Sequence, residues 1–330
     1  MFSGIQPSGD LTLGSYMGAI RNWVDMIDDY NAFYCIVDMH AITVRQVPAD
    51  LRRRTLEQLA QYIACGLDPH KVTLFVQSHV PAHAELGWVL NCFTMFGALP
   101  HDAVQRQERQ ARRQYKRRPV HLPRPHGGGY PCSTRRTLSP VGDDQKQHVE
   151  LCRDVAIRFN NIYGDVFTIP QAYIPRVGAR IMSLTDPTSK MSKSDKDPNG
   201  CVHLLEKPED IMRKFKRAVT DSDTSENCVR FAPAEKPGVA EPHADLLLRH
   251  GQDLRRDRKD FTGKGYGAFK TAVGEAVVGY SFVPSAREAT RMLADKAYLG
   301  ERLPYGRRRP PPSPARPCAK VYKKLGFIAR

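Results

Sequence analysis

Residues 33–42 read FYCIVDMHAI, a near-continuous apolar run with its polar residues toward the C-terminal end. The run VTLFVQSHV at 72–80 has the same form. Between them, DLRRRTLEQLAQYIACGLD (50–68) carries apolar residues at helical spacing and reaches a Gly near its end. A strand, a helix and a second strand, with both strands apolar on both faces, predict a parallel α/β sheet.

The stretch GIQPSGDLTLGSYMGAI (4–20) predicts the first strand of this sheet, a tight turn and a helix that begins near Thr12. Gly14 and Gly18, four residues apart, fall on one helical face and allow a close approach to the backbone. The N-terminus of a helix that follows the first strand of a parallel sheet is a natural phosphate site. The alternative interpretation is a tight turn with packing glycines. A dinucleotide-binding G-x-G-x-x-G is absent after this strand.

From about residue 205 the apolar spacing becomes helical, in KPEDIMRKFKRAV (207–219) and GAFKTAVGEAVVGY (267–280). These segments predict a second, smaller helical domain. KVYKKLGFIA (320–329) is predicted to be a closing helix.

Composition indicates a soluble globular chain with enough residues to bury a sizeable core, since 41% of its 330 residues are hydrophobic. No apolar run approaches the roughly 18 residues of a membrane span, and MFSGIQPSGD lacks the features of a signal peptide. The eight Cys are scattered without a C-x-x-C pair or a metal-ligand spacing, as expected of reduced, buried thiols in a cytoplasmic protein. Met1 lies almost inside the first strand, so we expect a few upstream residues to be missing.

The net charge of +15 is typical of a protein that binds nucleic acid, but its distribution weakens that interpretation. Residues 101–140 contain ten Lys or Arg against two acidic residues, and residues 301–317 contain five Arg against one Glu. Both stretches are also rich in Pro. The rest of the chain is therefore nearly neutral.

KMSKS (190–194) follows a polar DPTS stretch. Two ammonium groups three residues apart, flanked by small hydroxyls, can neutralise a polyphosphate while charge builds on its leaving group. The alternative interpretation of two Lys in a polar stretch, and the more common one, is a charged loop exposed to solvent. However, this string is expected by chance with a probability of roughly less than one in a thousand for a chain of this length.

With these motifs the chain resembles the bacterial tryptophanyl-tRNA synthetases, which are class I aminoacyl-tRNA synthetases. KMSKS is the signature of the class, and TLGS (12–15) stands where the class has its HIGH motif, with Ser15 where relatives often have Asn. GIQPSG and the following segments carry the resemblance to the tryptophan enzymes: CIVDMHAIT (35–43), PVGDDQKQHVEL (140–151) and GARIMSL (178–184). The resemblance covers residues 1–99 and 140–238 and, more patchily, 260–280 and 319–330.

The resemblance implies a Rossmann-like parallel sheet with a smaller helical domain. It also implies these domains: a nucleotide-binding catalytic domain at 1–188, a KMSKS loop at 189–196, a helical domain on the tRNA anticodon side at 197–280, and a C-terminal segment at 281–330 that returns toward the catalytic domain. The implied reaction joins L-tryptophan to ATP as an adenylate and then transfers the aminoacyl group to tRNA(Trp). A cytoplasmic homodimer with no membrane association is expected.

Roles are implied residue by residue. The ATP-binding positions would be Gln6, Pro7, Ser8, Gly14, Ser15, Gly142, Asp143, Asp144, Ile181, Lys190, Met191, Ser192, Lys193 and Ser194. Lys190 and Lys193 would be catalytic and grip the leaving pyrophosphate, with Mg²⁺ sharing the charge and no metal site made by protein side chains. Gln145 and His40 would lie by the amino-acid pocket, with His40 at the end of the second strand. A structural His at a strand end is the alternative for His40.

One segment departs from the family. After residue 99, relatives continue with a segment like RMTQFKDKSA and later LMAADIL before PVG, and neither string is present here. The possible codons for Pro100–Glu108, when read one base later, can encode the first string as far as its Ser. The possible codons for Pro125–Pro131, read in the same shifted frame, can encode the second string. These two matches predict a frame slip over about 100–139, most simply a sequencing or gene error.

The frame slip changes the expected pocket, because the carboxylate that would pair with the indole N–H falls at Gly129. Weaker signs of the same kind lie near 240–258 and 281–318, where GRRRPPPSPARP interrupts an expected helix. Three alternatives stay open: a basic RNA-binding arm at 100–139, a tyrosyl-type synthetase, and a frame-damaged or inactive relative that keeps only the scaffold.

Overall fold

The structure is a computed structural model of the 330-residue chain. It describes residues 1–94, 138–140, 146–173, 181–191, 197–220, 223, 225, 265–279, 283–295, 297, 299 and 315–327. The elements in chain order are β1 (Phe2–Ile5), α1 (Leu13–Ser15), the π-helical η1 (Tyr16–Ile20), α2 (Arg21–Asp25), β2 (Phe33–Ile36), α3 (Asp38–Ala41), α4 (Pro48–Ala64), β3 (Thr73–Val76), the 3₁₀ helix η2 (Gln77–His79), α5 (Pro81–Cys92), β4 (Leu138–Pro140), α7 (Lys146–Tyr163), β5 (Gln171–Tyr173), the 3₁₀ helix η5 (Pro198–Gly200), α8 (Pro208–Arg217), α12 (Tyr266–Val277), α13 (Val283–Ala294) and α16 (Ala315–Leu325).

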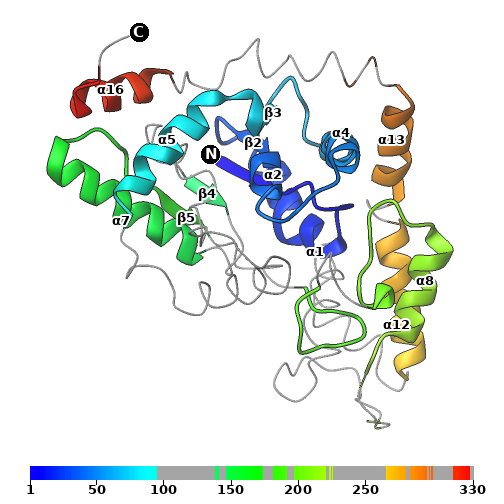
Figure 1. Ribbon diagram of the computed structural model, residues 1–330. Coiled ribbons are helices and arrows are strands. Elements are labelled where there is room, and N and C mark those ends of the chain that lie inside the picture. The colour runs from blue at the N-terminus through cyan, green and yellow to red at the C-terminus, as the bar shows by residue number, and fades with distance from the viewer. Residues whose placement is uncertain are drawn as a thin grey trace.

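The predicted parallel sheet is confirmed. β1, β2 and β3 pair in parallel in that order, with Phe2 opposite Phe33 and Phe33 opposite Thr73. β4 and β5 form a second parallel pair, and β4 lies close to β1 (Figure 1).

Both faces of the three-stranded sheet are buried. Tyr34 and Ile36 of β2 belong to one hydrophobic cluster, together with residues of α2 and α4. Phe33 and Cys35, which alternate with them along the strand, belong to another cluster on the opposite face. This two-sided burial explains why the strands read as continuous apolar runs rather than alternating ones.

The two strands read from the sequence are shorter than predicted. β2 ends at Ile36, and residues 38–41 of the expected strand form α3. The Asp38 carboxylate accepts hydrogen bonds from the amides of Met39 at 2.9 Å and Ser78 at 3.0 Å, and so turns the chain where β2 ends. β3 likewise ends at Val76 and continues as η2.

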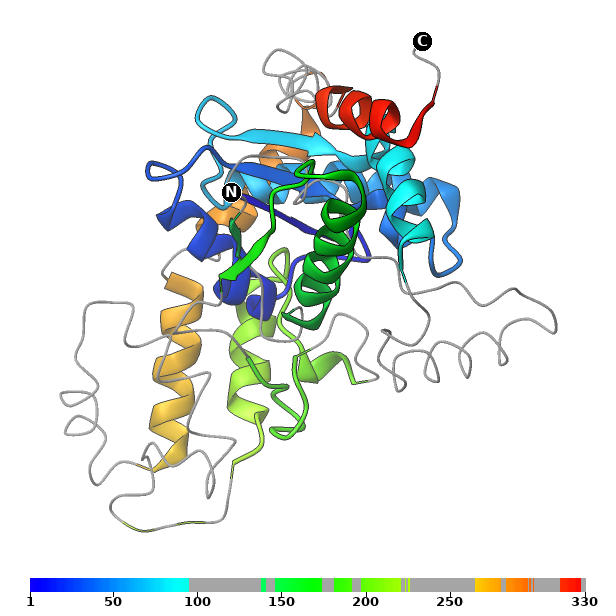
Figure 2. The same ribbon diagram turned by 90° about the vertical axis from the view of Figure 1, so that its left-hand side faces the viewer.

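The helical segments predicted after residue 205 are confirmed as α8 and α12, which pack side by side (Figure 2). Their contact is close at Gly274, where an added Cβ would lie 2.7 Å from the sulfur of Met212. Ile211 of α8 and Val273 of α12 join the same hydrophobic cluster as Trp23 of α2. The described part of the helical region therefore shares a core with the sheet region.

The C-terminal helices return to the sheet region: α13 packs on α4, and α16 packs on α5 (Figure 1). The closing helix differs from the predicted one, because α16 begins at Ala315 and ends at Leu325. Gly326, with φ 80°, is the left-handed residue that commonly ends a helix. The Pro-rich run does enter this helix, since Pro317 lies in its first turn, where a missing N–H costs no helical hydrogen bond.

Candidate active site

The loop between β1 and α1 carries the first of the predicted ATP-binding residues. The amide of Ser8 donates to the carbonyl of Gln6 at 2.9 Å. Gly9 has φ 147°, a conformation that other residues adopt rarely. Pro7 is buried and Ser8 is exposed, so the turn presents its tip to solvent.

Thr12 fixes the start of the helix, as the sequence predicted. Its hydroxyl accepts a hydrogen bond from the Ser15 amide at 3.1 Å and lies 3.1 Å from the Ser15 hydroxyl. The Leu13 amide donates to the carbonyl of Val202 at 2.8 Å. Within the described residues, no acceptor is seen for the Gly14 amide, as is usual for an amide in the first turn of a helix.

Residues 181–191, which lead into KMSKS, form a tight antiparallel hairpin. The Ser183 amide donates to the carbonyl of Ser189, and the Met191 amide donates to the carbonyl of Ile181, each at 2.8 Å. Met182 and Lys190 face each other in this pairing. The hairpin presents the Lys190 side chain to solvent.

The turn of this hairpin is held by Asp186. Its carboxylate accepts hydrogen bonds from the hydroxyls of Ser189 and Thr188, each at 2.6 Å, and from the Thr188 amide at 3.1 Å. The hydrogen bonds from Ser189 and then Thr188 lower the pKa of Asp186 below its usual value. These hydrogen bonds therefore favour the charged form of the Asp186 carboxylate.

The hairpin and the helix start meet at Gly14. A Cβ added to Gly14 would lie 3.7 Å from the Cβ of Ile181 and 3.8 Å from the Cβ of Met191. Both of these side chains are buried in the main hydrophobic cluster. The TLGS segment and the first two residues of KMSKS, far apart in sequence, thus lie together, and Lys190 extends from this junction.

A third segment, residues 201–204, joins the same junction. Leu204 donates from its amide to the carbonyl of Leu11 at 2.7 Å, and Thr12 pairs with His203 in an antiparallel bridge. This backbone pairing places the chain that enters α8 directly against the start of α1.

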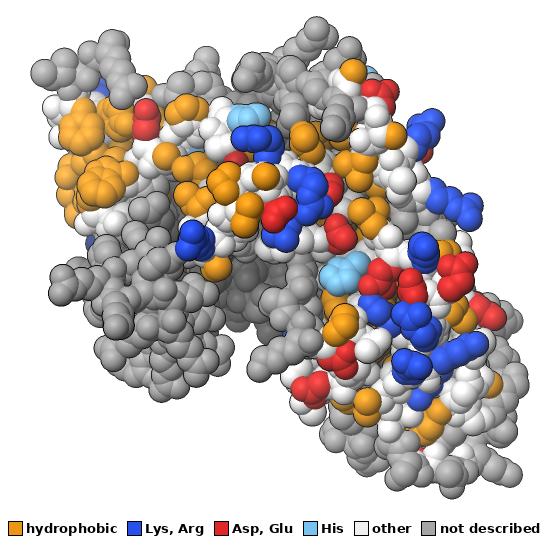
Figure 3. Space-filling view, turned by 45° about the vertical axis from the view of Figure 1, so that its right-hand side comes forward, with side chains coloured by type: hydrophobic (Ala, Val, Ile, Leu, Met, Phe, Trp, Pro, Cys, Tyr) orange, Lys and Arg blue, Asp and Glu red, His pale blue; other side chains and the backbone are white. Residues whose placement is uncertain are grey.

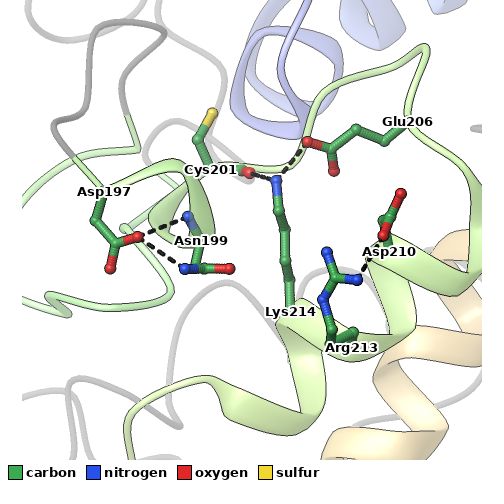
Figure 4. Close-up of polar contacts among 7 residues, drawn as sticks. All are labelled: Asp197, Asn199, Cys201, Glu206, Asp210, Arg213 and Lys214. Carbon is green, nitrogen blue, oxygen red and sulfur yellow. Dashed lines mark hydrogen bonds and ion pairs between the residues drawn. The ribbon is translucent and has the colours of Figure 1, made fainter.

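Lys214 anchors that segment from α8 (Figure 4). Its ammonium group donates to the carbonyl of Cys201 at 2.7 Å and forms an ion pair with Glu206. Sequence reasoning missed Lys214, although one signal was available. It stands beside Phe215 and three residues after Ile211, on the apolar face of its helix, where a buried Lys needs a partner.

His40 needs a correction. It lies on α3 after β2 has ended, rather than at the end of the strand. α3 follows directly from the carboxyl end of β2, so His40 is still at the edge of the sheet where ligands bind in parallel α/β folds.

The remaining predicted site residues lie outside the described residues: Gly142, Asp143, Asp144, Gln145, Ser192, Lys193, Ser194 and the shifted-frame position Gly129. In the part of the chain that is described, no group of three or more His, Cys, Asp or Glu could hold a metal ion. No described helix is long and apolar enough to cross a membrane.

Basic side chains gather over α8 (Figure 3). Lys207, Arg213, Lys216 and Arg217 are exposed there. Acidic groups are interspersed, and Arg213 pairs with Asp210 at 2.7 Å (Figure 4). The surface is therefore mixed in sign, with a local excess of positive charge along one helix.

A family model for the class I tRNA synthetases (W and Y) matches residues 1–279. The chain belongs to this family. It is similar to a tryptophan–tRNA ligase of Clostridium tetani (strain Massachusetts / E88), with 45% identity over 338 residues that cover 99% of this chain and 96% of that protein. The predicted class I synthetase fold is thereby confirmed.

Two solved structures of this family extend the match to the whole fold. Tryptophanyl-tRNA synthetase from Mycoplasma pneumoniae has a TM-score of 0.85 and 29% identity, covering 99% of this chain and 97% of that one. The enzyme from Campylobacter jejuni, solved in complex with ADP and tryptophan, has a TM-score of 0.77 and 27% identity, covering 99% of each chain.

Proposed function

We propose that this class I synthetase is a tryptophan–tRNA ligase, which activates L-tryptophan with ATP and transfers it to tRNA(Trp). The junction at Gly14 is the observation that carries the proposal, because it joins the TLGS turn to the hairpin that bears Lys190. The 45% identity to a tryptophan–tRNA ligase favours tryptophan over tyrosine.

In the first step, the tryptophan carboxylate attacks the α-phosphorus of ATP, and pyrophosphate leaves. We assign the phosphates to Gln6, Pro7, Ser8, Gly14 and Ser15, and the adenosine end to Gly142, Asp143, Asp144 and Ile181. Lys190 and Lys193, with Met191, Ser192 and Ser194 between and beside them, would meet the charge that builds on the leaving pyrophosphate. Stabilisation of that charge is where such a site contributes most to the rate.

Mg²⁺ would enter with the nucleotide rather than through a protein cage. Mg²⁺ commonly binds through substrate phosphates and keeps several of its own waters. Bound there, it would share the negative charge of the pyrophosphate.

The amino-acid side of the site would include His40 and Gln145. In the second step, the aminoacyl group passes from the adenylate to the 3′ end of tRNA(Trp). The exposed basic residues of α8 support an approach of the tRNA backbone on the side of the helical region, since phosphate contacts dominate such binding.

We further propose a homodimer in the cytoplasm. α5 and α7 share a hydrophobic cluster and leave Trp88, Ile157 and Ile162 exposed, as a subunit interface would. The cysteines in the described part of the chain are free thiols, which suits a reducing compartment.

The test is ATP–pyrophosphate exchange with tryptophan or tyrosine as the amino acid. We expect exchange that depends on tryptophan in a frame-corrected protein. Exchange that depends on tyrosine would instead support the tyrosyl alternative, and no exchange with either would support a scaffold without activity.

A further inference from the structure

Two buried side chains of α4 hold the N-terminal end of the loop between β1 and α1. The phenol oxygen of Tyr62 accepts a hydrogen bond from the Ile5 amide at 3.0 Å. The side-chain amide of Gln58 donates to the carbonyl of Ile5 at 2.7 Å and to the Tyr62 oxygen at 3.1 Å. Both polar groups of the last residue of β1 are thus bound by α4.

A third side chain of α4 holds the other end of this loop. The Gln61 amide oxygen accepts from the Leu11 amide at 2.9 Å, and its nitrogen donates to the Asp10 carboxylate at 3.4 Å. The Leu11 carbonyl is bound on its other side by Leu204. The five residues between Ile5 and Leu11 therefore form a loop whose two ends are both held by side chains of α4.

The burial of these groups makes the arrangement costly to lose. Gln58 and Gln61 are each 1% exposed, and Tyr62 is fully buried. Their spacing of three and four residues places them on one face of α4. Burial raises the pKa of Tyr62 above its usual value, so the phenol stays neutral. Buried polar groups are costly unless they are hydrogen-bonded, and these side chains make their hydrogen bonds to Ile5 and Leu11.

We propose that Gln58, Gln61 and Tyr62 are positioning residues for ATP, which fix the loop whose turn meets the phosphates. This inference rests on the proposed function, because it takes the β1–α1 loop as the phosphate-binding loop. None of the three side chains needs to touch the nucleotide. They act by holding the backbone of Ile5 and Leu11, so that loop amides are oriented before ATP arrives.

The test compares two loop variants with a matched control, in the full chain. Tyr62→Phe removes only the hydroxyl that holds Ile5, and Gln61→Met removes both hydrogen bonds at Leu11 and Asp10 while keeping the side-chain length. Tyr34→Phe is the control, because Tyr34 is also fully buried and its hydroxyl donates to the backbone carbonyl of Trp23 at 3.0 Å rather than to a residue of the loop. Dissociation constants are measured for ATP and for adenosine, with hydrogen exchange of the loop amides.

We expect each loop variant to weaken ATP binding roughly tenfold, the effect of one lost hydrogen bond with good geometry. Adenosine binding, which does not use the phosphates, should change by less than about twofold, as should ATP binding by Tyr34→Phe. Exchange of the Ile5 amide should accelerate in Tyr62→Phe, and that of the Leu11 amide in Gln61→Met.

Either of two results would overturn this inference without contradicting the proposed function. One is an ATP affinity in both loop variants equal to that of Tyr34→Phe. The other is an equal loss for ATP and adenosine, which would indicate general loosening of the fold. A parent chain that binds adenosine but gains nothing from the phosphates of ATP would instead contradict the proposed function of the loop, and the inference would fall with it.

Discussion

The ammonium group of Lys214 donates a hydrogen bond to the carbonyl of Cys201 at 2.7 Å and pairs with the carboxylate of Glu206. Cys201 begins the segment that pairs with Leu11–Leu13 at the start of α1. A single buried Lys thus ties α8 to the strand-like segment that joins the helical region to the phosphate loop.

Replacing Lys214 with Met should lower the free energy of unfolding by about 3 kcal/mol, because the largely buried Glu206 carboxylate loses its partner. Urea denaturation measures the loss. Lys216→Met, at an exposed position of the same helix, should change stability by less than about 0.5 kcal/mol. Equal effects of the two substitutions would show that the buried ion pair does not hold this segment.

An added methyl group should destabilise the fold much more at Gly4 than at Gly14. At Gly14 the new Cβ would make ordinary contacts of 3.6 to 3.8 Å, so Gly14→Ala should keep stability within about 1 kcal/mol. At Gly4 it would lie 2.5 Å from the carbonyl oxygen of Cys35, and Gly4→Ala should lower the free energy of unfolding by about 2 kcal/mol or more.

If Gly14 is needed for access of the nucleotide, Gly14→Ala should weaken ATP binding while it leaves the unfolding curve in place. Unaltered ATP affinity would make Gly14 a packing residue only.

His83 should make stability depend on pH. Burial lowers its pKa from the ordinary histidine value of 6.5 to about 4, and the ring packs against Phe75 at 5.7 Å between centroids. In the unfolded chain, His83 takes up a proton below about pH 6.5, whereas in the folded chain it stays neutral until about pH 4. The free energy of unfolding therefore falls as the pH is lowered from 6.5 to 4. The full loss is about 3 kcal/mol. Denaturation curves measured from pH 4 to 7 should lose this pH dependence of stability in His83→Phe. They should keep it in His79→Gln, which changes an exposed His. A parent-like pH profile in His83→Phe would contradict the assignment.

Lys190 should contribute to the chemical step. In a frame-corrected protein, Lys190→Ala should depress tryptophan-dependent ATP–pyrophosphate exchange roughly a hundredfold to a thousandfold, as loss of one contact to transition-state charge does. The same substitution at exposed Lys320 of α16 should leave exchange unchanged. Similar rates in both variants would mean that the KMSKS loop is merely solvated.

The parallel sheet and the main helices could be predicted because each depends on the local period of apolar residues. The strand ends could not, because β2 is stopped by Asp38, whose carboxylate binds the amide of Ser78 forty residues later. A contact between residues so far apart in the sequence does not change the local spacing of apolar residues, so that spacing cannot predict it.

The candidate site divides in the same way. TLGS and KMSKS could be recognised as strings, and the structure brings their first residues together at Gly14. Gln61, Tyr62 and Lys214 were missed, because a polar residue inside a helical pattern reads as exposed until its buried partner is known. Residues 100–139, on which the predicted frame slip falls, lie outside the described residues apart from 138 and 139, so the slip stays a prediction.

The decisive experiment measures tryptophan-dependent ATP–pyrophosphate exchange side by side on the written chain and on a version with the frame restored at 100–139. We predict that the restored enzyme exchanges with tryptophan and prefers it to tyrosine by a factor of roughly ten-thousandfold, as a pocket that hydrogen-bonds its substrate can. We predict little exchange from the written chain, whose ten Lys or Arg between residues 101 and 140 cannot fill a buried face. Equal tryptophan-dependent exchange from both versions would contradict the frame slip, and exchange with tyrosine instead of tryptophan would contradict the proposed specificity.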